Sequence, residues 1–132
     1  QLIDNIPDDD LFKWALFDRR PLTQWSRGRV TLLGDACHPT LPFLAQGAAM
    51  AIEDAAVLSR CLKTGTRVET SLQKYETLRR PRTARIQQAS RRNASIFHMR
   101  GLKTHARNLF APMASAQILN WLYSYDALTA HL

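Results

Sequence analysis

The sequence predicts an α+β chain that is mostly helical. The run "RVTLLG" (29–34) is short, β-branched and leucine-rich, which is typical of a strand buried on both faces. From about residue 46 to residue 123, apolar side chains recur at helical spacing, interrupted by glycine and proline. The chain has 132 residues, of which 45% are hydrophobic and 22% charged, as expected for one domain of ordinary size.

A second strand is predicted before this run. Residues 11–22, "LFKWALFDRRPL", mix aromatic and aliphatic side chains and reach a proline, so we expect a strand followed by a turn. The segment "TQWSRGR" (23–29) is interpreted as a short connector in which Gly28 supplies a turn. After the strand predicted at residues 29–34, Pro39 and Pro42 keep the next segment from being helical.

The first helix is predicted over about 46–62. Its positions at helical spacing are Ala48, Ile52, Ala55, Leu58 or Ser59, and Leu62. Gly65 ends this helix. A second helix begins near Glu69, where Thr66 or Thr70 is expected to cap it.

The rest of the chain is predicted to be helical with two interruptions. Pro81 lies inside the second helical pattern and is expected to kink or split it. The pattern then continues as a very basic helix to about Met99, and Gly101 breaks it. A last helix is expected over roughly 111–123.

The net charge of +7 is concentrated in the second part of the chain. Residues 1–60 hold six basic and eight acidic side chains, whereas residues 61–132 hold twelve basic and three acidic ones. Such a basic half suits an acidic partner, such as nucleic acid or an anionic lipid surface. The interpretation that we favour is a solvated helix face, since arginine is a good helix former.

Cysteine, histidine and apolar patterns bear on compartment, metals and membranes. Cys37 and Cys61, with no secretion signal ahead of them, are typical of a reduced cytoplasmic protein, although the sequence leaves a disulfide between them open. No metal is expected, because the histidines are scattered and form no paired motif with cysteine; they are His38, His98, His105 and His131. No apolar run approaches the roughly 20 residues that span a bilayer, so no membrane partner is expected.

An acid directly follows the strand predicted at residues 29–34. Asp35 comes directly after Gly34, and ligands of open α/β folds collect at the carboxyl ends of strands. A carboxylate accepts hydrogen bonds, so a ligand rich in hydroxyl groups, such as a ribityl or ribose chain, would satisfy it. The plainer interpretation is an aspartate that caps the next turn.

The start of the next helix carries a second signal. The chain enters it at Gln46-Gly47-Ala48, and the first turn of a helix has free backbone N–H groups. Gly47 has no side chain to block a flat ligand, and the helix dipole favours a group that carries negative charge. The plainer interpretation is an ordinary helix start with its alanines packed in a core. Together with Gly34-Asp35, these features predict a ligand site.

The segment "GDACHPTLPFLAQGAAMAIEDAAVL" (34–58) resembles the second flavin-binding motif of the class A flavin-dependent aromatic hydroxylases, which include the salicylate, 6-hydroxynicotinate and 4-hydroxybenzoate enzymes. The whole family pattern is present, with Gly34, Asp35, Ala36, His38, Pro42, Gln46, Gly47, Glu53, Asp54 and Ala55 in its positions. Segments 75–91 and 121–127 are similar to the family's C-terminal helices. The resemblance implies the C-terminal part of an FAD-binding, Rossmann-like α/β fold of the glutathione-reductase type, as in 4-hydroxybenzoate hydroxylase.

The resemblance implies a role for each matching residue. Asp35, after Gly34, would bind hydroxyls of the FAD ribityl chain, and Pro42 would lie near the flavin face at which oxygen reacts. Phe43 would contact the substrate ring, and His38 would orient the loop. Backbone N–H groups at the helix start would meet the N1–C2=O edge of the isoalloxazine, which becomes anionic on reduction; these residues are Gln46, Gly47, Ala48 and Ala49. No residue of the chain is assigned as a catalytic base.

The family also has a βαβ unit bearing Gly-x-Gly-x-x-Gly for the FAD pyrophosphate, and none of the five glycines here forms it. We therefore expect the chain to be the C-terminal part of a monooxygenase that is inactive alone and binds FAD weakly or not at all. Residues 1–28 would be the end of the substrate-domain sheet and a connector. Residues 29–64 would be the second FAD-binding motif, and residues 65–132 the C-terminal helices.

For the intact enzyme the resemblance implies a reaction. NADH or NADPH would reduce FAD, the reduced flavin would take up O2 as a C4a-hydroperoxide, and the distal oxygen would pass to a small aromatic substrate such as salicylate or a related acid. Phe43 stands where the 6-hydroxynicotinate branch has histidine, which weighs against that substrate. The family resemblance leaves a homo-oligomer open.

Three alternatives remain. The chain could belong to a lipid or quinone hydroxylase of the same superfamily, although no hydrophobic anchor supports this. It could be a non-catalytic basic helical module in which residues 79–107 bind nucleic acid, but its arginines lack the aromatic interleaving that stacks bases. That alternative also leaves the pattern at 34–55 unexplained. Finally, the chain could be a degenerate remnant without activity.

Overall fold

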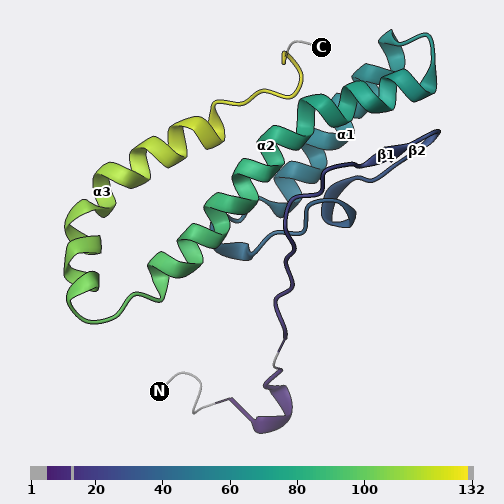
Figure 1. Cartoon of the computed structure of the whole chain (residues 1–132). Helices are drawn as coiled ribbons and strands as arrows, with labels where there is room; N and C mark the ends of the chain where they lie inside the picture. Colours follow the sequence, from purple (N-terminus) through teal and green to yellow (C-terminus); the bar gives the residue numbers. More distant parts are fainter. Residues whose placement is uncertain (1–5, 13, 131–132) are drawn as a thin grey trace.

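The computed structural model describes residues 6–12 and 14–130, which form a short β-hairpin and several helices. In chain order the elements are η2 (Asp8–Asp10), β1 (Ser26–Arg27), β2 (Val30–Thr31), η3 (Gly34–Ala36), η4 (Pro42–Leu44), α1 (Gly47–Thr64), α2 (Val68–Phe97) and α3 (Leu102–Tyr123). Helix α1 lies against α2, α3 turns back alongside α2, and the N-terminal segment runs away from the helices (Figure 1). The prediction of a mostly helical chain is confirmed.

The strand predicted at 29–34 is shorter and more exposed than expected. Only Val30–Thr31 forms β2, which pairs antiparallel with β1 so that Arg27 lies opposite Val30. Val30 is 68% exposed, so the expectation of burial on both faces was wrong. Leu32 instead packs against the core just after the strand ends. A strand needs a partner for its N–H and C=O groups, and within the described chain only the two residues of β1 pair with β2.

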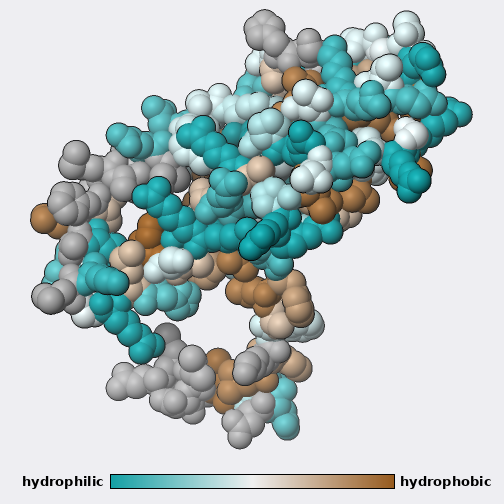
Figure 2. All heavy atoms as spheres, viewed as in Figure 1, coloured by the Kyte–Doolittle hydropathy of each residue, from teal (hydrophilic) through white to brown (hydrophobic). Residues whose placement is uncertain are grey.

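The strand predicted within residues 11–22 is absent from the described part of that segment, and Lys13 lies outside the described residues. Apolar side chains are exposed here, including Phe12, Trp14, Leu16 and Phe17. Figure 2 shows this apolar surface below the mainly hydrophilic surface of the helices. The segment is attached to α2 by the ion pair of Asp18 with Arg91. The residue pattern suits a strand, but no described strand lies alongside it.

Helix α1 confirms the prediction for this region, beginning one residue after Gln46 and ending just before Gly65. Its buried face follows helical spacing and consists of Met50, Asp54, Val57 and Cys61. Gly65 lies close to the start of α2, since a Cβ there would lie 2.0 Å from Ser71 Oγ and 3.0 Å from the Cys61 carbonyl oxygen. A side chain at this position would require the Ser71 hydroxyl to move.

Helix α2 differs from expectation at both its start and its middle. Arg67 is the N-cap and no side chain caps the helix; Thr70 Oγ1 donates to the Arg67 carbonyl instead. The helix is neither split nor ended by Pro81. Proline leaves the carbonyl of Thr77 without its helical donor, and both residues are exposed.

Two clusters of buried apolar side chains form the core. One contains Trp25, Cys37, Val57, Cys61 and Tyr75, and the other contains Met50, Ile86 and Leu122. Both cysteines are buried and free, so the disulfide left open by the sequence is absent.

Helix α3 begins at Leu102, earlier than expected, directly after Gly101. None of the helices described is both long and apolar enough to cross a bilayer.

Candidate functional site

The turn that carries Asp35 is a single turn of 3-10 helix, η3. Gly34 opens it with φ +60°, a conformation that glycine adopts without strain. Its carbonyl accepts hydrogen bonds from the backbone N–H groups of Cys37 (3.0 Å) and His38 (2.9 Å). Asp35 lies at the middle of this turn and is exposed. The prediction that this acid follows directly on a strand was wrong, since β2 ends at Thr31.

The start of α1 has the free amides that the sequence predicts. Gln46 is the N-cap, it is buried, and no side chain caps the helix. Within the described part of the chain, no acceptor is found for the amides of Gly47, Ala48 and Ala49. A Cβ on Gly47 would approach nothing closer than Thr40 Cγ2, at 3.9 Å. Ala48 is exposed, so this helix end is open to a ligand.

The proline loop lies between these two features. Pro42 opens η4 and is exposed, whereas Phe43 is half-buried. The ring of Phe43 packs against Phe97, with centroids 5.8 Å apart, and edge-on against His98, at 6.0 Å. Phe43 is therefore attached to the end of α2 through an aromatic cluster, which the sequence did not indicate.

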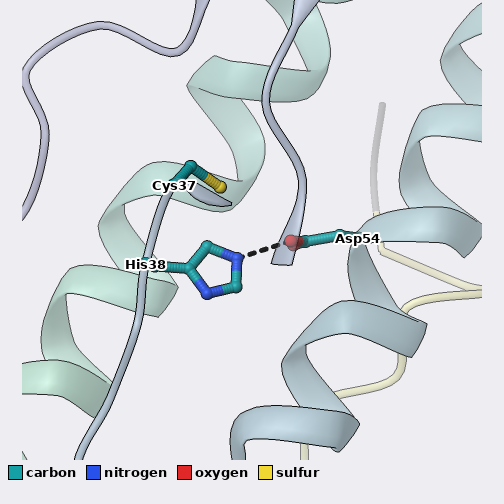
Figure 3. A group of neighbouring side chains, drawn as sticks. All are labelled: Cys37, His38 and Asp54. Carbon is teal, nitrogen blue, oxygen red and sulfur yellow. Dashed lines mark hydrogen bonds and ion pairs between the residues drawn. The ribbon is translucent and has the colours of Figure 1, made fainter. Parts of the chain in front are cut away.

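Asp54 joins the Asp35 turn to α1. Its Oδ2 accepts a hydrogen bond from the Gly34 backbone N–H at 3.1 Å and lies 2.5 Å from His38 Nε2 (Figure 3). The turn also packs closely on the helix, since a Cβ on Gly34 would lie 3.3 Å from that of Ala51. The turn that carries Asp35 is thus packed against α1. The orienting role predicted for His38 is consistent with this contact.

The other side of Asp54 is bound by α2. Arg79 Nε lies 2.7 Å from Asp54 Oδ1, and Arg79 Nη2 lies 2.7 Å from Glu53 Oε2. Arg82 makes two further hydrogen bonds to Glu53, at 2.8 and 2.7 Å. Both guanidinium groups lie over the ring of Tyr125, with Arg82 Cζ 4.0 Å from the ring centroid. The C-terminal segment therefore covers the ion pairs that hold α1 to α2.

These contacts set the charge states. Burial raises the pKa of Asp54, but hydrogen bonds from His38 and Arg79 outweigh that effect, and the pKa is lowered overall. Burial acts to lower the pKa of Arg79, yet the hydrogen bond and charge of Asp54 raise it overall. Both groups are therefore charged in the folded protein, and each stabilises the other's charge.

Sequence reasoning missed this network. The sequence places Glu53 and Asp54 in the family pattern without a role, and it predicts a solvated helix face for the basic residues of 61–132. One signal was present: Asp54 lies at helical spacing from Met50, Val57 and Cys61, on the buried face of α1. A buried acid requires a charged partner, so a search for one would have led to the arginines of α2.

A group of three potential metal ligands also lies here, formed by Cys37, His38 and Asp54. Both oxygens of Asp54 already accept hydrogen bonds. The Cys37 thiol donates to the Gly34 carbonyl, and burial together with the nearby Asp54 charge raises its pKa to about 12. A metal requires thiolate and free carboxylate oxygens, so this cluster is better described as a packed hydrogen-bond network.

Comparisons with known proteins agree on one family. The family described as "FAD binding domain" matches residues 10–90. The chain is 40% identical to 3-hydroxybenzoate 6-hydroxylase of Polaromonas naphthalenivorans (strain CJ2) over 119 residues. This match covers 86% of this chain and 30% of that enzyme. It is 51% identical over 86 residues to 6-hydroxynicotinate 3-monooxygenase of Pseudomonas fluorescens, covering 64% of this chain and 22% of the enzyme.

A solved structure supports the same relationship. The substrate complex of salicylate hydroxylase superposes with a TM-score of 0.73 at 32% identity, over 86% of this chain and 29% of that one. The chain thus spans under a third of the length of each of these three proteins.

Proposed function

The chain belongs to the FAD-binding domain family, and on that premise we propose that it supplies the flavin-facing turn and helix start of an NAD(P)H-dependent monooxygenase. Three similar proteins carry the names of hydroxylases or monooxygenases of small aromatic compounds. The proposed reaction is hydroxylation of such a compound with O2, by the oxygen-transfer route that the family resemblance implies.

One observation carries the proposal: the turn with Asp35 and the start of α1 form a single rigid unit. Asp54 holds the Gly34 N–H at 3.1 Å, and Gly34 packs so closely on α1 that a Cβ there would lie 3.3 Å from that of Ala51. An exposed carboxylate and a set of free amides are therefore held in fixed relative positions. Such preorganised polar groups are what a rigid polar cofactor needs.

The residues fit FAD. Asp35, an acceptor, would take hydrogen bonds from ribityl hydroxyls. The free amides of Gly47 and Ala48 would donate to the N1–C2=O edge of the isoalloxazine, where the helix dipole stabilises negative charge. Exposed Pro42 would lie against the ring face. When bound, FAD would supply electron transfer and oxygen activation, while the residues of this chain bind and orient it.

The division of the chain follows from the same proposal. Residues 29–64 would face the flavin, and residues 65–132 would pack behind them. Residues 1–28 would contribute to a sheet of the intact enzyme. Support for this comes from the exposed apolar side chains near the N-terminus, such as Phe12 and Trp14, in a segment whose pattern suits a strand.

A small aromatic acid is the proposed substrate class. Phe43 and its neighbour Phe97 present aromatic surface beside Pro42, and aromatic rings stack or pack edge to face with such substrates.

The nucleic-acid alternative is not favoured by the structure. Four arginines of its basic stretch bind acids of this chain, namely Arg79, Arg80, Arg82 and Arg91. Guanidinium groups held by carboxylates have less capacity for phosphates, which weakens the electrostatic basis of that alternative.

The proposal is tested in a chimera in which this chain replaces the matching residues of the Polaromonas 3-hydroxybenzoate 6-hydroxylase. We expect the purified chimera to carry FAD, seen as flavin absorbance, and Asp35→Ala to weaken FAD binding roughly tenfold or more, since hydrogen bonds to a charged group contribute about 1.5–3 kcal/mol. The 132-residue chain alone should bind FAD weakly or not at all.

Asp10→Ala is the matched control, because Asp10 is another exposed acid in a 3-10 helix. Its affinity for FAD should equal that of the parent chimera. If the folded chimera lacks FAD, or if the two substitutions have equal effects, the proposed role of Asp35 is wrong. A tight, yellow, stoichiometric complex of FAD with the isolated chain would overturn the expectation that the chain holds only part of the site.

A further inference from the structure

Three polar side chains on one face of α2 bind the backbone of the proline loop. They donate hydrogen bonds to carbonyls at alternate loop positions: Gln87 Nε2 to Pro39 O (2.9 Å), Ser90 Oγ to Leu41 O (2.6 Å) and Asn93 Nδ2 to Phe43 O (3.2 Å). We call Gln87, Ser90 and Asn93 the α2 ladder. None of the three was a candidate from the sequence, where they lie in a stretch dominated by arginine.

The three donors lie on one face of α2, because residues three apart on a helix share a face. The carbonyls that accept from them belong to Pro39 and Leu41, ahead of η4, and to Phe43 within η4. Pro42 remains exposed on the loop. Gln87 is 2% exposed and Ser90 0%, and Asn93 is half-buried. A carbonyl shielded from water is costly to leave without its donor, so these three hydrogen bonds favour the observed position of the loop.

The third hydrogen bond of the α2 ladder, from Asn93, is made to Phe43, the residue proposed to contact the substrate. Asn93 holds the carbonyl of Phe43, and one turn further along α2 the ring of Phe43 packs against Phe97. Both the main chain and the side chain of this residue are thus positioned by the same helix. The position of α2 determines where the aromatic surface of Phe43 lies.

We propose that Gln87, Ser90 and Asn93 are positioning residues that fix the 39–43 loop and thereby set the affinity for the aromatic substrate. The claim that these residues set substrate affinity rests on the proposed function. The claim that they fix the 39–43 loop does not, because it concerns only the isolated chain. Each claim is therefore tested by its own measurement.

The claim about the loop is tested by ¹⁵N relaxation on the 132-residue chain. In Ser90→Ala and Asn93→Ala, order parameters of the loop amides (Thr40, Leu41, Phe43 and Leu44) should fall from about 0.85 towards 0.6. Those of α1 should stay unchanged. Ser95→Ala is the matched control: Ser95 is exposed on the same helix and bonds only the Arg91 carbonyl within α2. Unchanged order parameters of the loop amides, or an equal fall throughout α1, would show that the α2 ladder does not fix the 39–43 loop.

The claim about substrate affinity is tested in the FAD-containing chimera with 3-hydroxybenzoate as the probe. Its dissociation constant is read from the change in flavin absorbance, without turnover. Ser90→Ala combined with Asn93→Ala should keep the FAD content and weaken 3-hydroxybenzoate binding roughly fivefold to tenfold, since the apparent dissociation constant rises as the binding-competent loop position becomes less populated. An unchanged dissociation constant would refute the claim about substrate affinity. A chimera without FAD would refute the proposed function, while the relaxation result would still decide the ladder.

Discussion

Arg79 and Asp54 form an ion pair that is closed to solvent: Arg79 Nε lies 2.7 Å from Asp54 Oδ1, and both side chains are 0% exposed. The other oxygen of the same carboxylate binds the Gly34 N–H and His38. Helix α2 is thereby connected, through one acid of α1, to the turn that carries Asp35. The position of the proposed flavin contact depends on a residue that does not itself face the ligand.

Replacing Asp54 with asparagine should destabilise the chain strongly. The substitution leaves Arg79 buried without a counter-charge, and breaking one side of a buried pair costs roughly 3 kcal/mol or more. The free energy of unfolding in urea measures this. Asp126→Asn, which makes the same change at an exposed acid, should cost less than about 1 kcal/mol. Equal effects of the two substitutions would contradict the role given to Asp54.

Acid should unfold the protein through Asp54 and the other paired acids. Because the folded pKa of Asp54 is below its ordinary value of 3.8, its stabilising contribution is present above that pH and is lost as the pH falls further. The pKa of Asp18 is lowered in the same way, first by its hydrogen bond with Arg91. The free energy of unfolding, measured from pH 6 to pH 2, should therefore fall steeply below about pH 4. A rise in stability over that interval would show that the sign is wrong.

Two glycines with almost the same backbone conformation should respond differently to alanine. Gly34 has φ +60° and Gly28 has φ +58°, so both substitutions carry the left-handed strain of roughly 1–2 kcal/mol. A Cβ on Gly34 would also lie 3.3 Å from that of Ala51, whereas nothing lies within 4 Å at Gly28. Gly34→Ala should therefore be the more destabilising in urea denaturation. If Gly28→Ala costs as much, the turn does not pack on α1 as described.

The ring of Tyr125 should stabilise the chain through its two arginines. Tyr125→Leu removes the cation–π contacts with Arg79 and Arg82, which should cost about 1–2 kcal/mol. Tyr123→Leu is the matched control, since Tyr123 is 69% exposed. Thermal or urea unfolding of the two variants gives the comparison. A larger loss for Tyr123→Leu would mean that the C-terminal segment does not cover the ion pairs.

Much of the secondary structure could be predicted because its causes are local. The bounds of α1 follow from helical spacing between Gln46 and Gly65, and the break at Gly101 follows from glycine. The order of a glycine, an acid and a helix start at residues 34–48 predicted a ligand site, and both that site and its binding of FAD stay predictions.

The failures share a physical cause, which is that they depend on distant parts of the chain. A strand pattern near Trp14 forms no strand in the described chain, since strand hydrogen bonds come from another segment. Pro81 neither splits nor ends α2, and Arg79 and Arg82 hold the helix to α1 on either side of it. The local rule for proline does not include such contacts.

The sequence by itself determined the helices, the breaks between them and the motif that identifies the family, since spacing and residue type are enough for each. Only the tertiary structure decided that Asp54 and Arg79 are buried partners and that the α2 ladder holds the proline loop. Both depend on side chains 25 to 50 residues apart in the chain. Their energy comes from the exclusion of water at these contacts, which exists only once the helices have packed.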